Sequence, residues 1–406
     1  MLAFLLSCSP SAIELGPGDD ASDGVERPEG TDTESDTDEE EEDDPHPERL
    51  FSLDRIHAVD LEIASDDLRS LRTDPYTHVP ADLSFDDAAF PSIGVRIKGR
   101  LGSYRELTGK PAFKLDLDRF QGEARLEGLK AVSLNNMVQD YAQVHERAAY
   151  GVFRAMGIPA PRVGYAWVRI NGDDYGLYSL VEEYDDEFLE ANFQDPSGNL
   201  YDGDYYLPDN GNYVLLDFVA SSQDLIQLDE GTDVGLADVH ALTDAIAASA
   251  GTSSFQSTVG ALADLDQHAR FLAVTAWIGH YDSYSYYSNN YRVYFDPADG
   301  GRALMMPWDP DWAFYSGTAI TSPLGVLSAA CFADAECHAD AQAVRDEIDD
   351  VLAREGVWED IEATMTLIRP AIEEDTRREV SLGYLDYYQD DLESWFQRRT
   401  GEMGAF

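Results

Sequence analysis

Residues 279–290 read Gly-His-Tyr-Asp-Ser-Tyr-Ser-Tyr-Tyr-Ser-Asn-Asn, and residues 307–312 read Pro-Trp-Asp-Pro-Asp-Trp. Each run is rich in polar side chains and follows an apolar stretch. Carboxylate and amide oxygens of this kind are the ligands that hard cations prefer in proteins. The two runs therefore contain a candidate cation site if the fold brings them together. Its candidate ligands are Asp282, Asn290, Asp309 and Asp311.

The segment between the two runs predicts a pair of short strands. Residues 291–295 and 302–306 are short and largely apolar, and residues 296–300 read Asp-Pro-Ala-Asp-Gly, which is typical of a tight turn. Such a hairpin would return the chain and place the second run beside the first. Protein kinases supply their catalytic base and metal ligands from a similar order of a helix, an Asp loop with a downstream Asn, two strands and a second Asp.

The rest of the chain predicts strands first and helices after. The expected strands are 58–63, 93–98, 112–117, 163–170 and 175–182, and the expected helices are 140–156, much of 236–279, and 340–406. Asn171 and Gly172, a strong turn signal, join two of these strands. This order is typical of an α+β fold, and we expect one domain, residues 49–406, with a cleft between two lobes.

The N-terminal region predicts export. Leu5-Leu6-Ser7-Cys8 resembles a bacterial lipobox in which Cys8 would be lipidated, although residues 1–8 are shorter than a secretory signal. Residues 9–48 are rich in Asp, Glu, Ser, Thr, Pro and Gly, and we expect a disordered acidic linker there. A cytosolic acidic tail is the alternative. The prediction is an extracytoplasmic protein, lipid-anchored at the bacterial envelope or secreted.

The charge balance excludes several classes of partner. The chain has 28 Lys and Arg against 79 Asp and Glu, a formal net charge of −51, so a basic groove for nucleic acid or an anionic membrane is not available. Membrane contact is expected only through a lipid on Cys8. Lysine is rare, so a reaction that needs a lysine has few candidates. The lysines are Lys98, Lys110, Lys114 and Lys130.

The spacing of Cys331 and Cys337 favours a local disulfide. Five residues separate them, and no further Cys or His set stands nearby to complete a metal tetrad. A disulfide would agree with an oxidising compartment. Two free thiols are the alternative.

A lysine and a glutamate upstream suggest nucleotide binding. Lys114 lies in an alternating strand, and Glu146 on the following helix could reach it, as in the Lys–Glu pair that positions ATP phosphates. A pair of unrelated, solvated charges is the alternative. Gly99 and Gly102 leave the backbone free to approach a phosphate. No Walker motif or Gly-x-Gly-x-x-Gly occurs, so the nucleotide hypothesis depends on the order of these residues.

Several segments, taken in order, resemble a known family. They are residues 95–100, 110–115, 146 within His-Glu-Arg-Ala-Ala-Tyr, 157–162, 171–182, 198–204, 290–294 and 307–311. In this order and spacing they resemble the CotH kinases, which are atypical, spore-coat-type protein kinases. The resemblance covers the chain from about Asp60 to the C-terminal helices.

The resemblance implies a divergent two-lobed protein-kinase-like fold and transfer of the ATP γ-phosphoryl group to Ser of surface or secreted proteins, with Mg²⁺ or Mn²⁺. By motif matching, Asp282 and Asp309 would be catalytic, and the metal ligands would be Asp309, Asn290 and Asp311. The nucleotide-binding residues would be Lys114, Glu146, Gly99, Gly102 and Glu182, with Lys110 as the alternative lysine.

Departures from the family pattern leave two other functions open. Asn289 stands where the family usually has His, and Pro111 stands where it often has a second lysine. One alternative is a non-catalytic surface pseudokinase or adhesin-like module with a structural cation. The other is purely structural Ca²⁺ binding by the three aspartates of the two runs, since calcium takes six to eight oxygen ligands.

Overall fold

The computed structural model describes residues 46–207, 213–315, 322–404 and 406. They belong to one compact unit, Pro45–Phe406. The expected lipidation site at Cys8 and nearly all of the expected linker, residues 9–48, lie outside the described residues.

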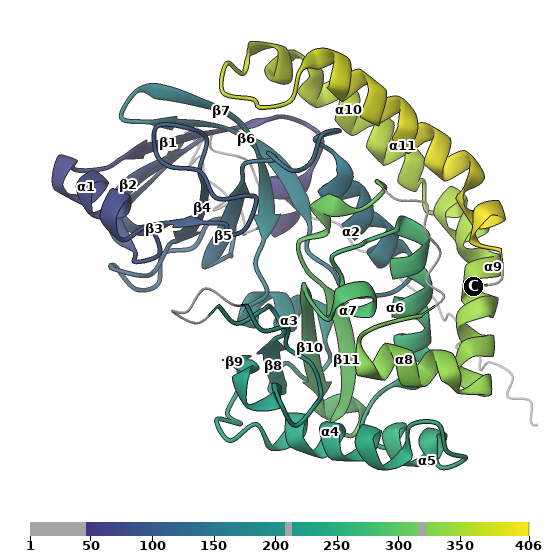
Figure 1. The fold of residues 1–406 in the computed structure, drawn as a ribbon. Coiled ribbons are helices and arrows are strands. Elements are labelled where there is room, and N and C mark those ends of the chain that lie inside the picture. Colours follow the sequence, from purple (N-terminus) through teal and green to yellow (C-terminus); the bar gives the residue numbers. More distant parts are fainter. Residues whose placement is uncertain (1–45, 208–212, 316–321, 405) are drawn as a thin grey trace, which may run out of the picture. The chain divides into compact units, whose positions relative to one another are not determined.

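Seven strands form a closed barrel in the order β1-β2-β3-β4-β5-β7-β6 (Figure 1). Neighbours are antiparallel except β1 and β6, which are parallel. Alternating side chains fill the interior, as in β2, where every second residue is buried. The bounds are β1 (His57–Glu62), β2 (Val79–Phe85), β3 (Ala88–Lys98), β4 (Ala112–Asp116), β5 (Ala131–Asn135), β6 (Val163–Ile170) and β7 (Asp173–Glu182), with α1 (Ser65–Thr73) between β1 and β2.

The hairpins expected from sequence are confirmed. β3 pairs with β4, and β6 pairs with β7. The turn between β6 and β7 places Asn171 at φ 49° and Gly172 at φ 82°. Two residues with positive φ are what a tight hairpin turn of this kind requires, and Asn and Gly adopt that conformation at low cost.

A second sheet and a set of helices form the rest of the described chain. The sheet has the order β11-β10-β8-β9 (Figure 1). Its strands are β8 (Asn199–Asp202), β9 (Gln227–Glu230), β10 (Tyr291–Asp296) and β11 (Arg302–Pro307). The helices are α2 (His145–Ala155), α3 (Asp186–Asn192), α4 (Ala237–Ser249), α5 (Phe255–Val259), α6 (Leu265–Ile278), α7 (Tyr284–Tyr287), α8 (Val326–Ala333), α9 (Ala335–Arg354), α10 (Val357–Glu374) and α11 (Leu382–Met403). The α+β expectation is confirmed at this level.

Helix α6 is the centre of the larger core, which is separate from the core inside the barrel. Nearly all of its side chains are buried. Asp264 caps its first turn by accepting from the Gln267 N–H, and Gly279 ends it in the left-handed conformation at φ 61°. A buried, well-capped helix therefore delivers the chain into the run that begins at Gly279.

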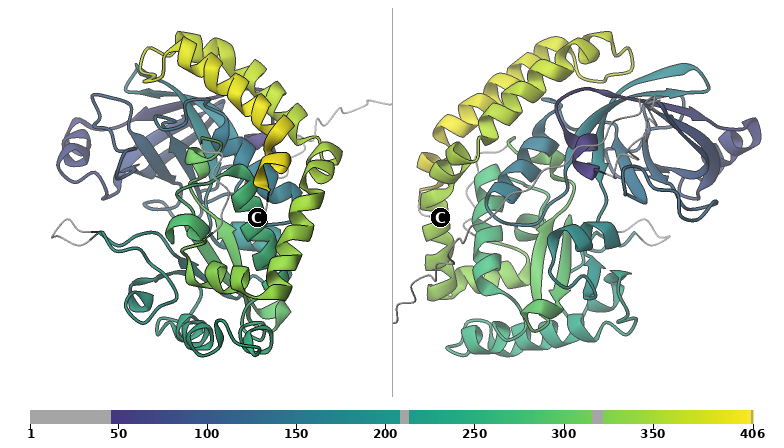
Figure 2. Two further views of the ribbon diagram at one scale, coloured as in Figure 1. Left: turned by 45° about the vertical axis from the view of Figure 1, so that its right-hand side comes forward. Right: turned by 180° about the vertical axis from the view of Figure 1, so that it is seen from behind.

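The C-terminal helices cover this core. In both views of Figure 2, α10 and α11 run side by side. A disulfide joins Cys331 of α8 to Cys337 of α9, so the expected local pairing is confirmed. Among the described residues, no helix combines the length and the apolar character that crossing a bilayer requires.

Candidate functional site

Asp282 lies in the loop between α6 and β10, where two amides fix its carboxylate. Asn289 Nδ2 donates to Oδ1 at 3.2 Å, and Asn290 Nδ2 donates to Oδ2 at 3.0 Å. Burial raises the pKa of Asp282 to about 6, and the charge of Asp309 acts in the same direction. The first run of the sequence therefore folds so that its two asparagines orient its aspartate.

The β10–β11 hairpin brings the second run to the first, as the sequence predicts. Tyr291 pairs with Pro307, and the Trp308 N–H donates to the Asn290 carbonyl at 3.1 Å. Asp309 follows with φ 46°, and its backbone N–H donates to the Tyr150 hydroxyl of α2 at 3.1 Å. An aspartate in the left-handed region costs about 1–3 kcal/mol, so the surrounding structure must hold this turn in place.

The carboxylates of the site raise one another's pKa values. Burial raises the pKa of Asp311 well above its usual range, and Asp309, Glu146, Asp140 and Asp282 add to the effect. Burial and then Asp309 raise the pKa of Glu146 to about 7, and burial and then Glu146 raise that of Asp140 to about 8. Such repulsion acts mainly over short distances, so these side chains from distant segments lie close to one another.

Lys98, at the end of β3, is the lysine that faces these carboxylates. Its Nζ donates to Ser133 Oγ at 2.8 Å and lies 5.1 Å from the centre of the Trp308 ring. Burial lowers its pKa, and Glu183, Asp309 and Glu146 oppose that shift by attraction. A partly desolvated ammonium group beside paired carboxylates can bind a phosphate group.

The structure gives Lys114 a different partner from the expected Glu146, because its Nζ lies 2.9 Å from Glu183 Oε2. Glu146 instead accepts from Asn135 Nδ2 at 2.7 Å and from Ser179 Oγ at 2.8 Å. Strand β4 directs Lys114 toward the end of β7, where Glu183 follows. We therefore correct the expected pairing.

Lys110, the alternative lysine, lies in a separate buried ion pair. Its Nζ is 2.6 Å from Asp375 Oδ2, and both side chains are 1% exposed. Asp375 follows α10 and also accepts from the Leu177 N–H of β7 at 3.1 Å. Lys110 thus joins the barrel to the C-terminal helices, and its ammonium group contacts Asp375 and the Tyr178 ring and none of the acidic residues of the site.

The remaining predicted nucleotide-binding residues differ in their surroundings. Glu182 is buried and forms an ion pair with Arg162. Gly99 and Gly102 follow β3 with φ 89° and φ 85°. A Cβ at Gly102 would lie 2.9 Å from the Gln139 side chain, so both the conformation and the space favour glycine there.

The predicted metal ligands are neighbours but do not form a closed cage. Within the described part of the chain, one group of three acidic side chains has ligand atoms within 4.8 Å of one another, and it is Asp185, Asp186 and Glu187 of the α3 region. Lys130 and Arg125 form ion pairs with two members of that group, Asp186 and Glu187. An open set of oxygens is what Mg²⁺ uses when substrate phosphates complete its coordination.

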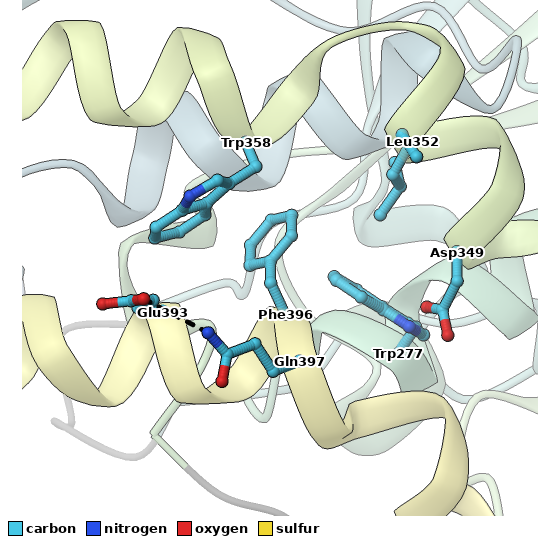
Figure 3. Close-up of a pocket in the computed structure, with 8 residues that line it drawn as sticks. Trp277, Asp349, Leu352, Trp358, Glu393, Phe396 and Gln397 are labelled. Carbon is cyan, nitrogen blue, oxygen red and sulfur yellow. Dashed lines mark hydrogen bonds between the residues drawn. The ribbon is translucent and has the colours of Figure 1, made fainter.

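A cavity of about 230 Å³ lies elsewhere, among the helices (Figure 3). Phe396 lies between Trp277 and Trp358 in this view. The lining residues are Trp277, Asp349, Leu352, Ala353, Trp358, Glu393, Phe396 and Gln397. None of them is a predicted site residue, so this cavity is distinct from the acidic site.

The sequence model of the CotH kinase protein family matches residues 95–403. Since this match covers well over half of the chain, the chain belongs to the CotH kinase protein family. The inner spore coat protein H of Bacillus subtilis (strain 168) is 25% identical over 188 residues, which are 45% of this chain and 50% of that protein. The match thus spans about half the length of this curated relative.

A solved structure is a more distant match. A chain of the Shewanella oneidensis MR-1 toxin antitoxin system HipA, HipB and its operator DNA complex shares 11% identity, with a TM-score of 0.34, over 83% of this chain and 78% of that chain. Similarity at this level does not assign a fold. The resemblance to the CotH kinases seen in the sequence is confirmed by the family match.

The sequence did not predict that Lys98, Asp140 and Glu183 lie among the charged groups of the site. Lys98 stands in the segment 95–100 that resembles the family, and the chain has only four lysines. The rarity of lysine could therefore have marked Lys98 as a candidate site residue. Asp140 precedes α2 and accepts from the His145 N–H at 2.7 Å, a local contact that a helix-start pattern can suggest. No local signal distinguishes Glu183 from Glu182.

Proposed function

We propose that this protein is a divalent-metal-dependent phosphotransferase that moves the γ-phosphoryl group of ATP to serine hydroxyls of exported proteins. Membership of the CotH kinase protein family supports the reaction class. The observation that carries the proposal is that three distant segments converge. Lys98 Nζ lies 5.1 Å from the ring of Trp308, the residue before Asp309. The Asp309 N–H donates to Tyr150, which lies on α2 one turn after Glu146. A lysine and carboxylates in one place can hold a nucleotide's phosphates and their metal ion.

In this proposal Lys98 binds the phosphate tail of ATP. Glu183 exerts the strongest attraction on the Lys98 ammonium group, ahead of Asp309 and Glu146. Glu146 is itself fixed by two hydrogen bonds from neighbouring side chains. The loop with Gly99 and Gly102 begins directly after Lys98, so its backbone is close to the same phosphates. Catalysis would come mainly from alignment and from charge stabilisation of the transferred group.

Asp282 orients the serine hydroxyl that attacks. Both its oxygens accept from asparagine amides, so the carboxylate cannot rotate freely. Its pKa of about 6 leaves it ionised at neutral pH, ready to accept a hydrogen bond from the hydroxyl.

A Mg²⁺ or Mn²⁺ ion fits the residues that are present. Burial raises the pKa values of both Asp309 and Asp311, and repulsion from four neighbouring carboxylates adds to the effect at Asp311, which a cation would relieve. Asn289 Oδ1 is also buried without a hydrogen-bond partner among the described residues. Asp309, Asn290 and Asp311 would hold the ion. When bound, such an ion neutralises the charge that develops on the transferred phosphoryl oxygens.

We also propose that the protein is extracytoplasmic, anchored through a lipid on Cys8 or secreted. The Cys331–Cys337 disulfide supports this location, because structural disulfides persist mainly in oxidising compartments. Fractionation of the host cell and mass spectrometry of the N-terminal peptide test it. A lipid on Cys8, or recovery outside the cytosol, supports the proposal, and a cytosolic chain contradicts it.

The reaction is tested with the full chain, labelled ATP, Mg²⁺ or Mn²⁺, and a panel of acidic and basic acceptor proteins. We expect label on serine in the wild type and a loss of at least about 100-fold in Asp309→Asn, the size typical for removing a group that stabilises transition-state charge. The matched control is Asp299→Asn, whose carboxylate pairs with Arg302 on the surface hairpin.

Two results would contradict the proposal. One is label transfer that persists unchanged in Asp309→Asn. The other is no transfer with either metal, together with a melting temperature that does not respond to Mg²⁺–ATP, which would favour a non-catalytic surface module. A melting temperature that responds to Ca²⁺ alone would favour a structural calcium site.

A further inference from the structure

The loop that carries Asp282 depends on contacts from outside the site. Its helical part, α7, is a single turn, and a single turn is unstable alone because several residues must be fixed for one hydrogen bond. Ser288 and Asn290 both have φ 51°, an uncommon conformation for residues other than glycine. Tertiary contacts must therefore determine where this loop lies.

The buried carboxylate of Asp217 accepts four hydrogen bonds, two of them from this loop. Oδ1 accepts from the Tyr284 hydroxyl at 2.9 Å and from the Phe218 N–H at 2.8 Å. Oδ2 accepts from the Ser288 hydroxyl and from the Val326 N–H, both at 3.0 Å. With Asp217 only 6% exposed, these bonds are shielded from water.

These bonds fix both ends of the α7 turn. Tyr284 begins α7, and Ser288 is the residue that ends it. The Tyr284 hydroxyl also accepts from the Leu327 N–H of α8 at 3.0 Å, so the turn is joined to a second element. Ser288 directly precedes the two asparagines that hold Asp282. If Ser288 moves, the two asparagine amides that follow it move as well, and the Asp282 carboxylate that they hold changes its orientation.

The start of the loop is fixed separately, by α11. Arg399 is buried and donates from Nε to the Trp277 carbonyl at 2.8 Å and from Nη2 to the Ala276 carbonyl. Trp395 Nε1 donates to the Trp277 carbonyl at 3.0 Å. These donors satisfy carbonyl groups at the C-terminus of α6. The far end is held at the Asn290 carbonyl by the Trp308 N–H, so Asp217 fixes the part of the loop that lies between these two anchors.

We propose that Asp217 is a positioning residue for phosphoryl transfer, fixing the end of this loop so that the asparagine amides keep the Asp282 carboxylate in its reacting orientation. The kinetic consequence rests on the proposed function, whereas the anchoring of the loop does not. A misplacement of about 1 Å in a reacting group can lower a rate about 100-fold, so anchoring of this kind has a measurable effect.

A carboxylate is needed because each of its oxygens accepts one backbone N–H, from Phe218 or from Val326. In Asp217→Asn one oxygen becomes an NH₂ donor. Whichever way the amide turns, it then opposes one of these two N–H groups. The loop must shift, or a buried donor stays unsatisfied.

Three variants of the full chain test the proposal. Asp217→Asn removes one acceptor. Tyr284→Phe removes one of the two loop hydroxyls that donate to Asp217, and with it the acceptor of the Leu327 N–H. Asp264→Asn is the matched control, because Asp264 accepts from the Gln267 N–H at 3.0 Å at the opposite end of α6. Asn keeps an acceptor for this N–H but loses the ion pair of Asp264 with Arg302 (3.3 Å), so a carboxylate beside α6 is removed without touching the loop.

Phosphoryl transfer is measured at a temperature at which all variants remain folded by circular dichroism. We expect kcat to fall about 10- to 100-fold in Asp217→Asn and less in Tyr284→Phe, with KM for ATP within about twofold of wild type. Asp264→Asn should lower the melting temperature but leave kcat unchanged. An equal loss of kcat in Asp264→Asn and Asp217→Asn would overturn the proposal.

Hydrogen exchange tests the anchoring without any activity. The amides of Tyr287 and Ser288 donate to the carbonyls of Ser283 and Tyr284 at 2.7 and 2.9 Å. They should exchange faster in Asp217→Asn than in Asp264→Asn, and unchanged exchange would overturn the proposal. If the wild type transfers no phosphate while this exchange still increases, the proposed function fails and the anchoring by Asp217 stands.

Discussion

Lys114 Nζ lies 2.9 Å from Glu183 Oε2, and this ion pair keeps Lys114 from Glu146. Burial alone would raise the pKa of Glu183, but Lys114 and Lys98 hold it well below its usual range. Glu183 therefore stays ionised and satisfies Lys114. Lys98 is attracted by the charge of Asp309 as well, so it is the lysine that borders the acidic site.

This arrangement predicts that Lys98→Met weakens ATP binding more than Lys114→Met does. A hydrogen bond to a charged group contributes about 1.5–3 kcal/mol, so the dissociation constant for ATP should rise about 10- to 100-fold in Lys98→Met. Lys114→Met should change it only slightly. Titration calorimetry with a non-hydrolysable ATP analogue and Mg²⁺ measures both, and a larger effect in Lys114→Met would refute the assignment.

Lys110→Met should lower stability and leave nucleotide binding intact. The Lys110–Asp375 pair is almost fully buried, and removing one partner of such a pair typically costs about 3–5 kcal/mol. Lys130→Met is the control, since Lys130 is partly exposed and surface pairs contribute at most about 1 kcal/mol. Urea unfolding gives both values. A weaker ATP affinity in folded Lys110→Met would show instead that Lys110 serves the site.

Glu146 should make the metal-free protein less stable as pH rises. Burial and then Asp309 raise the pKa of Glu146 from 4.5 to about 7. The folded state thus holds this proton more tightly than the unfolded state. The resulting stabilisation is complete below pH 4.5, the ordinary pKa of Glu, and is lost as pH rises through about 7, the pKa in the folded state.

Glu146→Gln removes that titration and isolates its contribution. As pH rises from about 4.5 to 7, the free energy of unfolding of wild type should fall relative to that of Glu146→Gln by on the order of 1–3 kcal/mol. Urea unfolding at several pH values in the presence of a chelator measures the shift. The exposed residue Glu190 provides the control, Glu190→Gln. Parallel pH profiles for wild type and Glu146→Gln would show that the Glu146 pKa is not raised.

Loss of the disulfide should destabilise the α8–α9 region. Closing a loop this short is worth about 2 kcal/mol through the entropy of the unfolded chain. The double variant Cys331→Ala/Cys337→Ala should therefore unfold at lower urea concentration than oxidised wild type. Reduced wild type should behave like the variant. No difference between oxidised and reduced wild type would mean that the bond adds no stability.

Local patterns predicted most of the helices and strands, and they predicted the hairpin that brings the two polar runs of the site together. Asn171-Gly172 marked a hairpin because that turn needs two residues with positive φ, and the hairpin between the two polar runs followed from short alternating strands. These signals are local, since the residues that create the structure are neighbours in the chain. The spacing of Cys331 and Cys337 predicted their disulfide for the same reason.

Contacts between distant segments could not be predicted in this way. The parallel pairing of β1 with β6, which closes the barrel, joins segments that carry no matching local signal. The choice between Glu146 and Glu183 as the partner of Lys114 is another example, because both carboxylates are suitable and only their placement differs. Asp217 is a third example, because the chain has many aspartates and no local pattern distinguishes this one as a residue that anchors a loop.

The sequence by itself predicted seven of the eleven described strands, the disulfide and the family, because each depends on side-chain pattern over short stretches or on motifs in a fixed order. Only the tertiary structure decided which lysine meets the carboxylates and which buried aspartate holds the Asp282 loop. The physical reason is that charge pairing depends on distance and burial, and both are properties of the packed chain.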